Sequence, residues 1–318
     1  MHCRKPLLQI AATALVAAMM STASIARAAE ATDLTRTYLN AYDDKCAFGA
    51  AHAVALRRYQ VLLVPGYLSD LNPAHFADHM QWLTSIGVAH QKVAIRSGHS
   101  AEINGAVIAN AIRGSAKQVI LISHSKGAID TLDALLSAPP LRAKVAGWIA
   151  MQGPFFGSPV ADKLLDGSLL NPFFATVVLG FFGGTRESAQ SLTTSASRAY
   201  YRARESAIAQ LLRDVPAVAF ASMIESAPGA AANTVLYMPH DLLARDGIRS
   251  DGLVPLDSAV LPGMDFVRVN GVDHIAPVTA AQQPFDRVRM TQALLLALRG
   301  ALRDLRDLPR DESCNASR

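Results

Sequence analysis

Charged residues, long apolar runs and low-complexity stretches are all scarce in this sequence of 318 residues. Only 18% of the residues are charged whereas 51% are hydrophobic, which excludes an intrinsically disordered chain. The 20 Gly and 16 Pro are near average and follow no period, which excludes collagen-like and low-complexity proteins. Only one early stretch approaches the length of a membrane span, so we do not expect a polytopic membrane protein.

That early stretch lies in a segment with the parts of a secretory signal peptide. Residues 1–28 have a basic start, an apolar run from Leu7 to about Met20, and a final Ala-Arg-Ala. A membrane anchor is the alternative, but the run is short and rich in small residues, so we predict cleavage and export to the periplasm or medium. Cleavage leaves 27 cations against 26 carboxylates, so the net charge falls from +4 to +1. We therefore expect no nucleic-acid partner, which would need clustered Lys and Arg.

Cysteine is almost absent, with three residues in the whole chain. Cys3 belongs to the predicted signal peptide, so the exported protein keeps Cys46 and Cys314. In an oxidising compartment, such a pair indicates a disulfide between an N-terminal helix and the C-terminal tail. Two unpaired thiols are the alternative.

Residues 29–318 contain no Gly/Ser-rich or Pro-rich linker and no repeat, so we expect one α/β domain. Short apolar runs alternate with helical patterns, which predicts a mostly parallel sheet covered by helices on both faces. The predicted strands are Tyr59–Val64, Gln91–Ile95, Gln118–Ile122, Ala146–Met151, Ala217–Met223 and Asp265–Val269. The predicted helices are Ala74–Ile86, Ala101–Ile112, Lys126–Ser137 and Pro284–Leu305.

One segment, about 161–214, breaks this alternation and reads as helices and loops. A Phe-rich part of it is too short, and too often interrupted by Pro and Gly, to span a membrane. We predict that the segment is an inserted helical cap over the carboxyl ends of the strands. Its aromatic residues are Phe173, Phe174, Phe181 and Phe182.

The strongest local signal is the sequence Ser-His-Ser-Lys-Gly at residues 123–127, between a predicted strand and a predicted helix. Small residues two before and two after Ser125 are typical of a nucleophile elbow, a turn too tight for bulky side chains. Ser123 stands where the usual pattern has Gly, and it is small enough to fit. We predict that Ser125 is a nucleophile exposed at the carboxyl edge of the sheet.

A serine nucleophile needs a histidine base and a carboxylate that orients the base. In an elbow of this kind, the order along the chain is Ser, then acid, then His. Asp251 lies in a Gly turn and His274 in a loop directly after a strand, so we predict that they complete a triad with Ser125. Asp273 is too close to His274 in sequence to reach its Nδ1 comfortably. The other competing acids are Asp246, Asp257 and Asp265.

An oxyanion hole is the remaining requirement, and two backbone amides are its predicted donors. The first is the N–H of Tyr67, in the Gly turn that ends the first predicted strand. The second is the N–H of Lys126, directly after the nucleophile. An ordinary strand-to-loop turn at Tyr67 is the alternative.

Taken together, these motifs resemble those of serine hydrolases of the α/β-hydrolase fold, and specifically of the secreted bacterial lipases. The resemblance covers most of the exported chain, and it implies the triad Ser125, Asp251 and His274. Pro65 departs from it, where many lipases have His, and so does Lys126, where an uncharged residue is usual. The matching pieces are VPGYLSD at Val64–Asp70, SHSKG at Ser123–Gly127, QGPFFGSPVAD at Gln152–Asp162, SDGLVP at Ser250–Pro255 and VDH at Val272–His274.

The activity implied is hydrolysis of acyl esters through an acyl-enzyme, with no cofactor and no metal. A lipase acting on lipid esters is the preferred interpretation. The alternatives that keep the triad are an esterase, a polyester depolymerase, a phospholipase and an acyltransferase. A catalytically silent binding protein is the alternative from another class.

Substrate contacts are predicted for Phe155, Phe156 and the four Phe of the cap. An apolar cap of this kind binds acyl chains or lies on a lipid–water interface. Packing of the same rings between cap and core is the alternative.

We expect structural roles for most of the other polar residues near these motifs. His75 and His79 are four apart on a predicted helix without a third ligand, so we expect a solvated helix face. We expect His124 to pack under the elbow. The Lys126 ammonium either attracts anionic substrates or pairs with a carboxylate.

Overall fold

The computed structural model describes residues 30–67, 69, 72–96, 98–167, 176, 185–225, 236–280, 285–298, 302, 305, 307–311 and 314. The predicted signal peptide at residues 1–28 lies outside the described residues. The same holds for four residues with predicted substrate contacts: Phe173, Phe174, Phe181 and Phe182.

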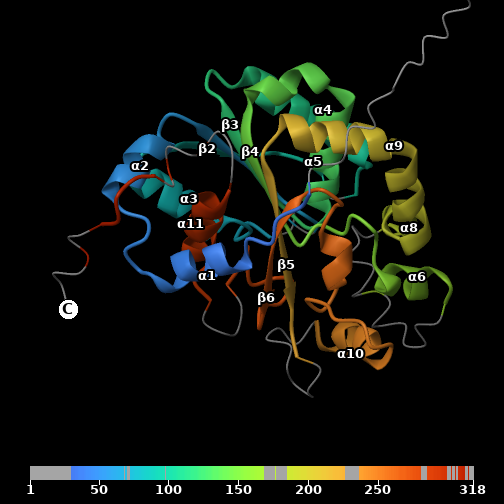
Figure 1. Cartoon of the computed structure of the whole chain (residues 1–318). Helices are drawn as coiled ribbons and strands as arrows, with labels where there is room; N and C mark the ends of the chain where they lie inside the picture. The colour runs from blue at the N-terminus through green and yellow to red at the C-terminus, as the bar shows by residue number, and fades with distance from the viewer. Residues whose placement is uncertain are drawn as a thin grey trace, which may run out of the picture.

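A six-stranded sheet forms the centre of the molecule, in the order β2-β1-β3-β4-β5-β6 (Figure 1). Every pair of neighbouring strands is parallel, so all carboxyl ends meet at one edge. The predicted mostly parallel sheet is therefore confirmed. Its strands are β1 (Gln60–Val64), β2 (Ala89–Lys92), β3 (Val119–His124), β4 (Val145–Met151), β5 (Ala217–Met223) and β6 (Asp265–Asn270).

The edge strand β2 begins and ends earlier than the predicted Gln91–Ile95. After Lys92 the backbone turns, with the N–H of Ile95 donating to the carbonyl of Val93. Val93 and Ile95 are nevertheless buried in the core. These apolar residues are therefore buried although the strand itself ends at Lys92.

Successive strand residues face opposite sides of the sheet and form two separate cores. Val61 and Leu63 belong to one core, whereas Leu62 and Val64 belong to the other. The first core is covered by α1 (Thr35–Asp43), α2 (Ala50–Leu56), α3 (Ala77–Ser85) and α11 (Arg287–Ala297). The second is covered by α4 (Ala101–Gly114), α5 (Lys126–Ser137) and α9 (Thr194–Asp214) (Figure 1). Helices on both faces confirm the predicted fold class.

Two helices are shorter than predicted, for local reasons. Helix α3 starts at Ala77 rather than Ala74, because Phe76 adopts a left-handed backbone with φ of 66°. Helix α11 starts at Arg287 rather than Pro284, where the Asp286 carboxylate caps it by accepting from the N–H of Arg289. It ends at Ala297, since the next residue has an extended backbone.

Described residues of the predicted cap, 161–214, are helical and contain no strand. They form most of α6 (Pro159–Leu165), all of α8 (Arg186–Ser191) and α9. Two shorter connections and one more helix complete the described fold: η1 (Pro139–Lys144), η3 (Leu256–Ala259) and α10 (Tyr237–Arg245). The function of this segment as a cap stays a prediction.

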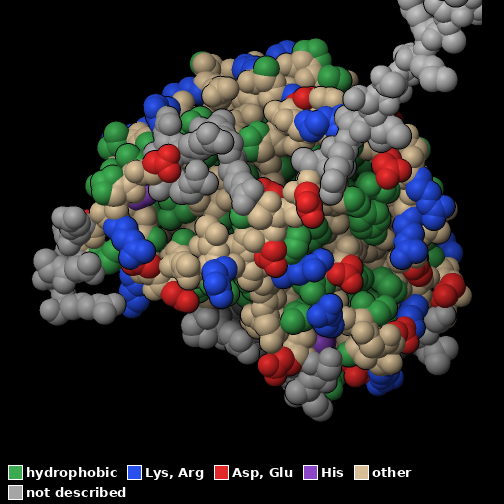
Figure 2. All heavy atoms as spheres, viewed as in Figure 1, with side chains coloured by type: hydrophobic (Ala, Val, Ile, Leu, Met, Phe, Trp, Pro, Cys, Tyr) green, Lys and Arg blue, Asp and Glu red, His purple; other side chains and the backbone are tan. Residues whose placement is uncertain are grey.

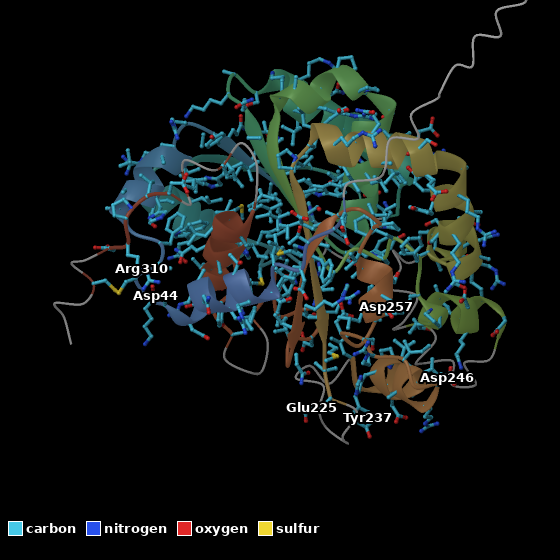
Figure 3. All side chains as sticks on the ribbon, in the orientation of Figure 1. Asp44, Glu225, Tyr237, Asp246, Asp257 and Arg310 are labelled. Atoms are coloured by element: carbon cyan, nitrogen blue, oxygen red, sulfur yellow. A yellow bond between two sulfur atoms is a disulfide. The ribbon has the colours of Figure 1, made fainter. Side chains whose placement is uncertain are left out.

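A disulfide joins Cys46, just after α1, to Cys314 near the C-terminus, with the two Cα atoms 5.6 Å apart. The predicted bridge therefore forms. Arg310 and Asp44 lie beside it and make an ion pair of 2.9 Å (Figure 3). Within the described residues, no helix has both the length and the apolar character of a membrane span. On the face drawn in Figure 2, basic and acidic side chains are interspersed, including over α9.

Candidate active site

The residues with predicted catalytic roles come from loops at the carboxyl edge of the sheet. Strand β1 has β2 on one side and β3 on the other, so the chain changes direction across the sheet between β1 and β3. In open parallel sheets such a switch point leaves a crevice between the two following loops. Tyr67 follows β1 and Ser125 follows β3, so both lie at this position.

The predicted elbow forms at Ser125, which has a φ of 53° between β3 and α5. Such a φ is strained for a residue with a side chain and is held by the surrounding packing. A Cβ at Gly127 would lie 2.4 Å from the carbonyl oxygen of Pro65, and one at Gly66 would lie 2.8 Å from Ser125 Cβ. Both glycines are therefore required for the loop after β1 to contact the turn at Ser125.

The three residues of the predicted triad are within hydrogen-bond distance of one another. Ser125 Oγ lies 2.9 Å from His274 Nε2, and His274 Nδ1 lies 2.8 Å from Asp251 Oδ2. All three side chains are buried, with exposed fractions of 8% for Ser125, 5% for His274 and 1% for Asp251. This geometry allows a neutral imidazole to accept the serine proton while a carboxylate faces its other nitrogen.

Backbone hydrogen bonds fix the position of the Asp251 carboxylate. Its Oδ1 accepts from the N–H groups of Leu253 and Val254, at 3.0 and 2.8 Å, which leaves Oδ2 for His274. The N–H of His274 donates in turn to the carbonyl of Asp251 at 2.9 Å. The neighbouring acid Asp273 instead accepts from two amides of its own turn, those of Ile275 and Ala276. Burial raises the pKa of Asp273.

His124 lies under the elbow, as the sequence predicts, and supports the loop that carries His274. Its Nε2 lies 2.9 Å from the carbonyl oxygen of His274 and 3.2 Å from Gln152 Oε1. The Gln152 amide nitrogen donates to the carbonyl of Asp273 at 2.9 Å and to Ser222 Oγ at 2.6 Å. Gln152 therefore joins the ends of β3 and β5 to the loop of His274.

The predicted oxyanion donors lie on either side of the contact between the β1 loop and the elbow. Within the described part of the chain, the amides of Tyr67 and Lys126 donate no hydrogen bond to another protein group. Lys126 is also the first residue of α5, so its amide lies at the positive end of the helix dipole. Both N–H groups are therefore available to a ligand oxygen.

The Lys126 side chain pairs with a carboxylate, which is one of the two alternatives left open by the sequence. Its ammonium lies 2.6 and 2.8 Å from the two oxygens of Asp130, one helical turn along α5. The Asn104 amide donates to the same carboxylate at 2.8 Å. Burial raises the pKa of Asp130 to about 6, against the opposing effect of Lys126 and Asn104. The ammonium also lies 5.5 Å from the centre of the Tyr67 ring.

Ser123, which replaces the usual Gly of the elbow, is fully buried and hydrogen-bonded. Its hydroxyl oxygen accepts from the indole N–H of Trp148 at 2.8 Å, and its O–H donates to the carbonyl of Ile149 at 3.4 Å. A glycine at this position would leave the buried indole N–H without this acceptor. Ser123, which departs from the usual pattern, therefore has a hydrogen-bond partner on β4.

A small cavity of about 90 Å³ opens beside Ser125 and His274, and His75 and His124 form part of its wall. The expected solvated helix face for His75 and His79 is wrong, because both are buried. Residues 73–76 form a turn ahead of α3, so the four-residue spacing does not place the two rings on one helix face. Burial lowers the pKa of each to about 3.

The paired aromatic residues after β4 lie away from this cavity. Phe155 is buried in the core against Trp148, with ring centres 6.0 Å apart. Phe156 contacts Tyr201 of α9 at 5.0 Å, in a separate groove. The described residues that line the cavity beside Ser125 include neither Phe155 nor Phe156. The structure therefore does not bring these two residues to the predicted triad.

Sequence reasoning missed two residues of this site. Gln152 carried no signal of its own beyond its place in a motif of the resemblance. Its role depends on a left-handed backbone, with φ of 52°, at the end of a buried strand. His75 was missed because its burial depends on the turn at Phe76, whose N–H donates to the distant carbonyl of Val278.

No protein-family model and no curated protein sequence matches this chain. Among solved structures it is similar to a metagenomic carboxyl esterase, with 22% identity, a TM-score of 0.60, and coverage of 79% of this chain and 77% of that one. It is also similar to the mature form of a lipase from Bacillus licheniformis, with 21% identity, a TM-score of 0.56 and coverage of 69% and 85%. Lipase 1 from Pelosinus fermentans shares 11% identity at a TM-score of 0.50, over 80% of this chain and 100% of that one. The chain therefore has the α/β-hydrolase fold.

Proposed function

We propose that this protein is a serine hydrolase of carboxylic esters, with Ser125 as the nucleophile, His274 as the base and Asp251 as the orienting acid. The observation that carries the proposal is the continuous hydrogen-bonded arrangement from Ser125 Oγ through the His274 imidazole to Asp251 Oδ2, at 2.9 and 2.8 Å. The likeness in fold to a carboxyl esterase and to lipases supports it.

The reaction has two halves. In the first, Ser125 Oγ attacks the ester carbonyl carbon while its proton passes to His274 Nε2. The alcohol leaves with that proton, and the acyl group stays on Ser125 as an ester. In the second half, His274 takes a proton from water, the hydroxide attacks the acyl carbon, and the acid leaves as Ser125 regains its proton. Asp251 stabilises the imidazolium in both halves without accepting its proton.

The amides of Tyr67 and Lys126 are proposed to bind the oxygen that becomes negative in each half. Neither amide donates a hydrogen bond to another protein group in the described part of the chain. The close approach of Gly66 to Ser125 brings the Tyr67 amide near the nucleophile. Loss of one such donor typically lowers turnover about 10²–10³-fold. The strained backbone of Ser125 is therefore part of the proposed mechanism, because it sets the Lys126 amide beside the reacting oxygen.

A test of this proposal uses a fluorophosphonate probe, which reacts with activated serines, together with hydrolysis of p-nitrophenyl butyrate. The Ser125→Ala variant is expected to lose labelling and at least about 10⁴-fold in kcat. Ser137→Ala, at the other end of α5, is the matched control and should keep both. A wild-type protein that neither reacts with the probe nor cleaves the ester would support the silent binding protein instead.

Export and cleavage after residue 28 are part of the same proposal, and the disulfide supports an oxidising compartment. Intact-mass analysis of the protein from a bacterial culture medium or periplasm tests them. The expected mass lacks residues 1–28 and is lower by a further two hydrogen atoms, which are lost when one disulfide forms. A full-length mass in the membrane fraction would instead favour residues 1–28 as an uncleaved membrane anchor.

The choice between lipase and esterase depends on an acyl-length series of esters. The predicted lipid contacts of Phe173, Phe174, Phe181 and Phe182 fall outside the described residues. Maximal activity on long acyl chains, with activation at a lipid–water interface, would support the lipase interpretation. Maximal activity on short soluble esters would support an esterase.

A further inference from the structure

Two buried imidazole nitrogens beside the proposed nucleophile have no hydrogen-bond partner in the described structure: His75 Nε2 and His124 Nδ1. Both residues are at most 5% exposed. A buried polar atom without a partner destabilises a fold, so native proteins satisfy nearly all such atoms. Both residues line the same small cavity beside Ser125, so a group bound there lies against their rings.

The chemical character of His124 Nδ1 follows from the opposite side of its ring. Nε2 faces two acceptors, the carbonyl oxygen of His274 and Gln152 Oε1, so it carries the ring proton. The Gln152 orientation is fixed because its amide nitrogen donates to the carbonyl of Asp273. Burial lowers the pKa of His124 well below its ordinary value, which keeps the ring neutral. Nδ1 is therefore a hydrogen-bond acceptor.

His75 supplies the second group, and its ring centre lies 5.3 Å from that of His124. Burial, together with the positive charge of Lys92, lowers the pKa of His75 to about 3, so this ring is also neutral. At Nε2 a neutral imidazole donates or accepts according to its tautomer. A hydroxyl group, which both donates and accepts, matches the two nitrogens.

The cavity itself is small, and a few polar groups interrupt a mostly apolar wall. Its volume of about 90 Å³ is well below the roughly 300–1,000 Å³ of pockets that bind drug-sized ligands. Besides the histidines, its wall includes Asn72 and Thr279, which share a hydrogen bond of 3.4 Å, and the apolar Val278. These dimensions and this lining suit a short group with a polar atom better than a long alkyl chain.

We propose that this cavity binds a short hydroxylated group attached to the scissile ester, and that His75 is the residue that selects it. The substrate class is thus esters that carry a hydroxyl a few bonds from the reacting carbonyl, on the acid or on the alcohol side. The inference rests on the proposed function, since it concerns the specificity of the same site.

Matched pairs of esters test the proposal and separate the two sides of the scissile bond. On the acid side, p-nitrophenyl 3-hydroxybutyrate is compared with p-nitrophenyl butyrate. On the alcohol side, 3-hydroxypropyl butyrate is compared with propyl butyrate by pH-stat titration. In at least one pair, the wild type is expected to show about a tenfold higher kcat/KM for the hydroxylated ester, the size of one good hydrogen bond.

Variants at His75 then assign the selectivity. His75→Phe keeps an aromatic ring without its nitrogens and should remove most of the tenfold ratio, whereas His75→Asn keeps hydrogen-bonding groups and should restore part of it. His79→Phe is the matched control, because His79 is equally buried but faces Thr291 at 2.9 Å and does not line the cavity. Its ratio should stay at the wild-type value.

Two results would overturn the proposal: a wild type without preference in either pair, or a His75→Phe variant that lowers both members of a pair equally. The second would mean a purely structural role for His75. If His75→Phe fails to fold, His75→Leu, which also lacks the ring nitrogens, takes its place in the same comparison. Failure of the proposed function looks different, because the wild type would then cleave no ester and would not react with the fluorophosphonate probe.

Discussion

Two buried polar clusters flank Ser125, and they differ in charge and in pairing. On the α5 side, Lys126, Asp130 and Asn104 are charged or strongly polar, and contacts of 2.6–2.8 Å satisfy the Asp130 carboxylate. On the other side, His75 and His124 are neutral, and each keeps one nitrogen without a partner in the described structure. Both clusters touch residues proposed to act in catalysis.

The difference indicates two separate roles, one in folding and one in substrate specificity. A buried charge is costly unless it is paired, so the cluster around Lys126 is complete without a ligand and stabilises the elbow and the Tyr67 ring. A neutral imidazole is less costly to leave unpaired, so it can stand in a cavity wall until a substrate meets it. We therefore expect substitutions in the charged cluster to act on folding, and substitutions in the neutral cluster to act on specificity and on pH dependence.

The largest effect is expected from Asp130→Asn, which leaves the buried Lys126 ammonium without its counter-charge. Removal of one partner of a buried ion pair costs about 3–5 kcal/mol in free energy of unfolding, measured here by urea denaturation. Asp241→Asn is the matched control. It breaks another pair spaced four residues apart, with Arg245, at the same 2.6 Å but with exposed fractions of 40% and 74%. That loss should stay below about 1 kcal/mol.

Equal losses from the two variants would contradict the comparison. A further variant, Lys126→Met with Asp130→Leu, replaces both charges by apolar groups and should recover most of the lost stability. If it remains as unstable as Asp130→Asn, the cost does not come from an unpaired charge.

A smaller effect concerns pH and the buried neutral histidines, which include His79 as well as His75. Since burial lowers the pKa of His75 and His79 to about 3, the unfolded chain binds protons below about pH 6.5 that the folded protein does not. The free energy of unfolding should therefore fall as pH decreases from about 6.5 towards 3. His79→Leu removes one such group, so its loss of stability between pH 7 and pH 5 should be about 2 kcal/mol smaller than in the wild type.

Urea denaturation of both proteins at several pH values checks this prediction. Between pH 7.5 and pH 9 the two curves should run parallel, because a histidine with an ordinary or lowered pKa is neutral throughout that range. Equal slopes between pH 7 and pH 5 would mean that His79 is protonated in the folded protein as readily as in the unfolded one.

The smallest effect is expected for a polar group that is both neutral and paired. Ser123→Ala removes the acceptor of the buried Trp148 indole and should cost about 1–2 kcal/mol in free energy of unfolding. A double-mutant cycle with Trp148→Phe tests the cause, since the serine substitution should cost much less once the indole N–H is gone. Additive losses would assign the cost to packing rather than to this hydrogen bond.

Much of the fold was predictable, because its signals are local. Buried parallel strands are continuous apolar runs, so five of the six strands lie within about two residues of their predicted bounds, and α5 begins and ends as predicted. The arrangement of Ser125, Asp251 and His274 was predictable for a related reason. Ser125 and His274 follow the carboxyl ends of β3 and β6, and parallel strands bring those ends to one edge. Asp251 comes after α10, and the N–H of Ile224, directly after β5, donates to the carbonyl of its neighbour Ser250.

The contacts around this arrangement were not predictable, because they depend on distant segments and on unusual backbone angles. The position of His75 depends on a left-handed Phe76 held by the carbonyl of Val278. The adjacent residues Phe155 and Phe156 also share one predicted role, whereas Phe155 turns into the core and Phe156 towards α9. Residue spacing describes one element at a time, and these contacts join several.

The bond between Cys46 and Cys314 makes the domain a covalently closed ring that contains Ser125, Asp251 and His274. A protease that cuts once between the two cysteines therefore produces one nicked molecule rather than two fragments. Such a product runs as a single band without reductant and as two bands with it. For a protein proposed to work outside the cell, among other secreted enzymes, a first cut would leave every proposed catalytic group on the same molecule.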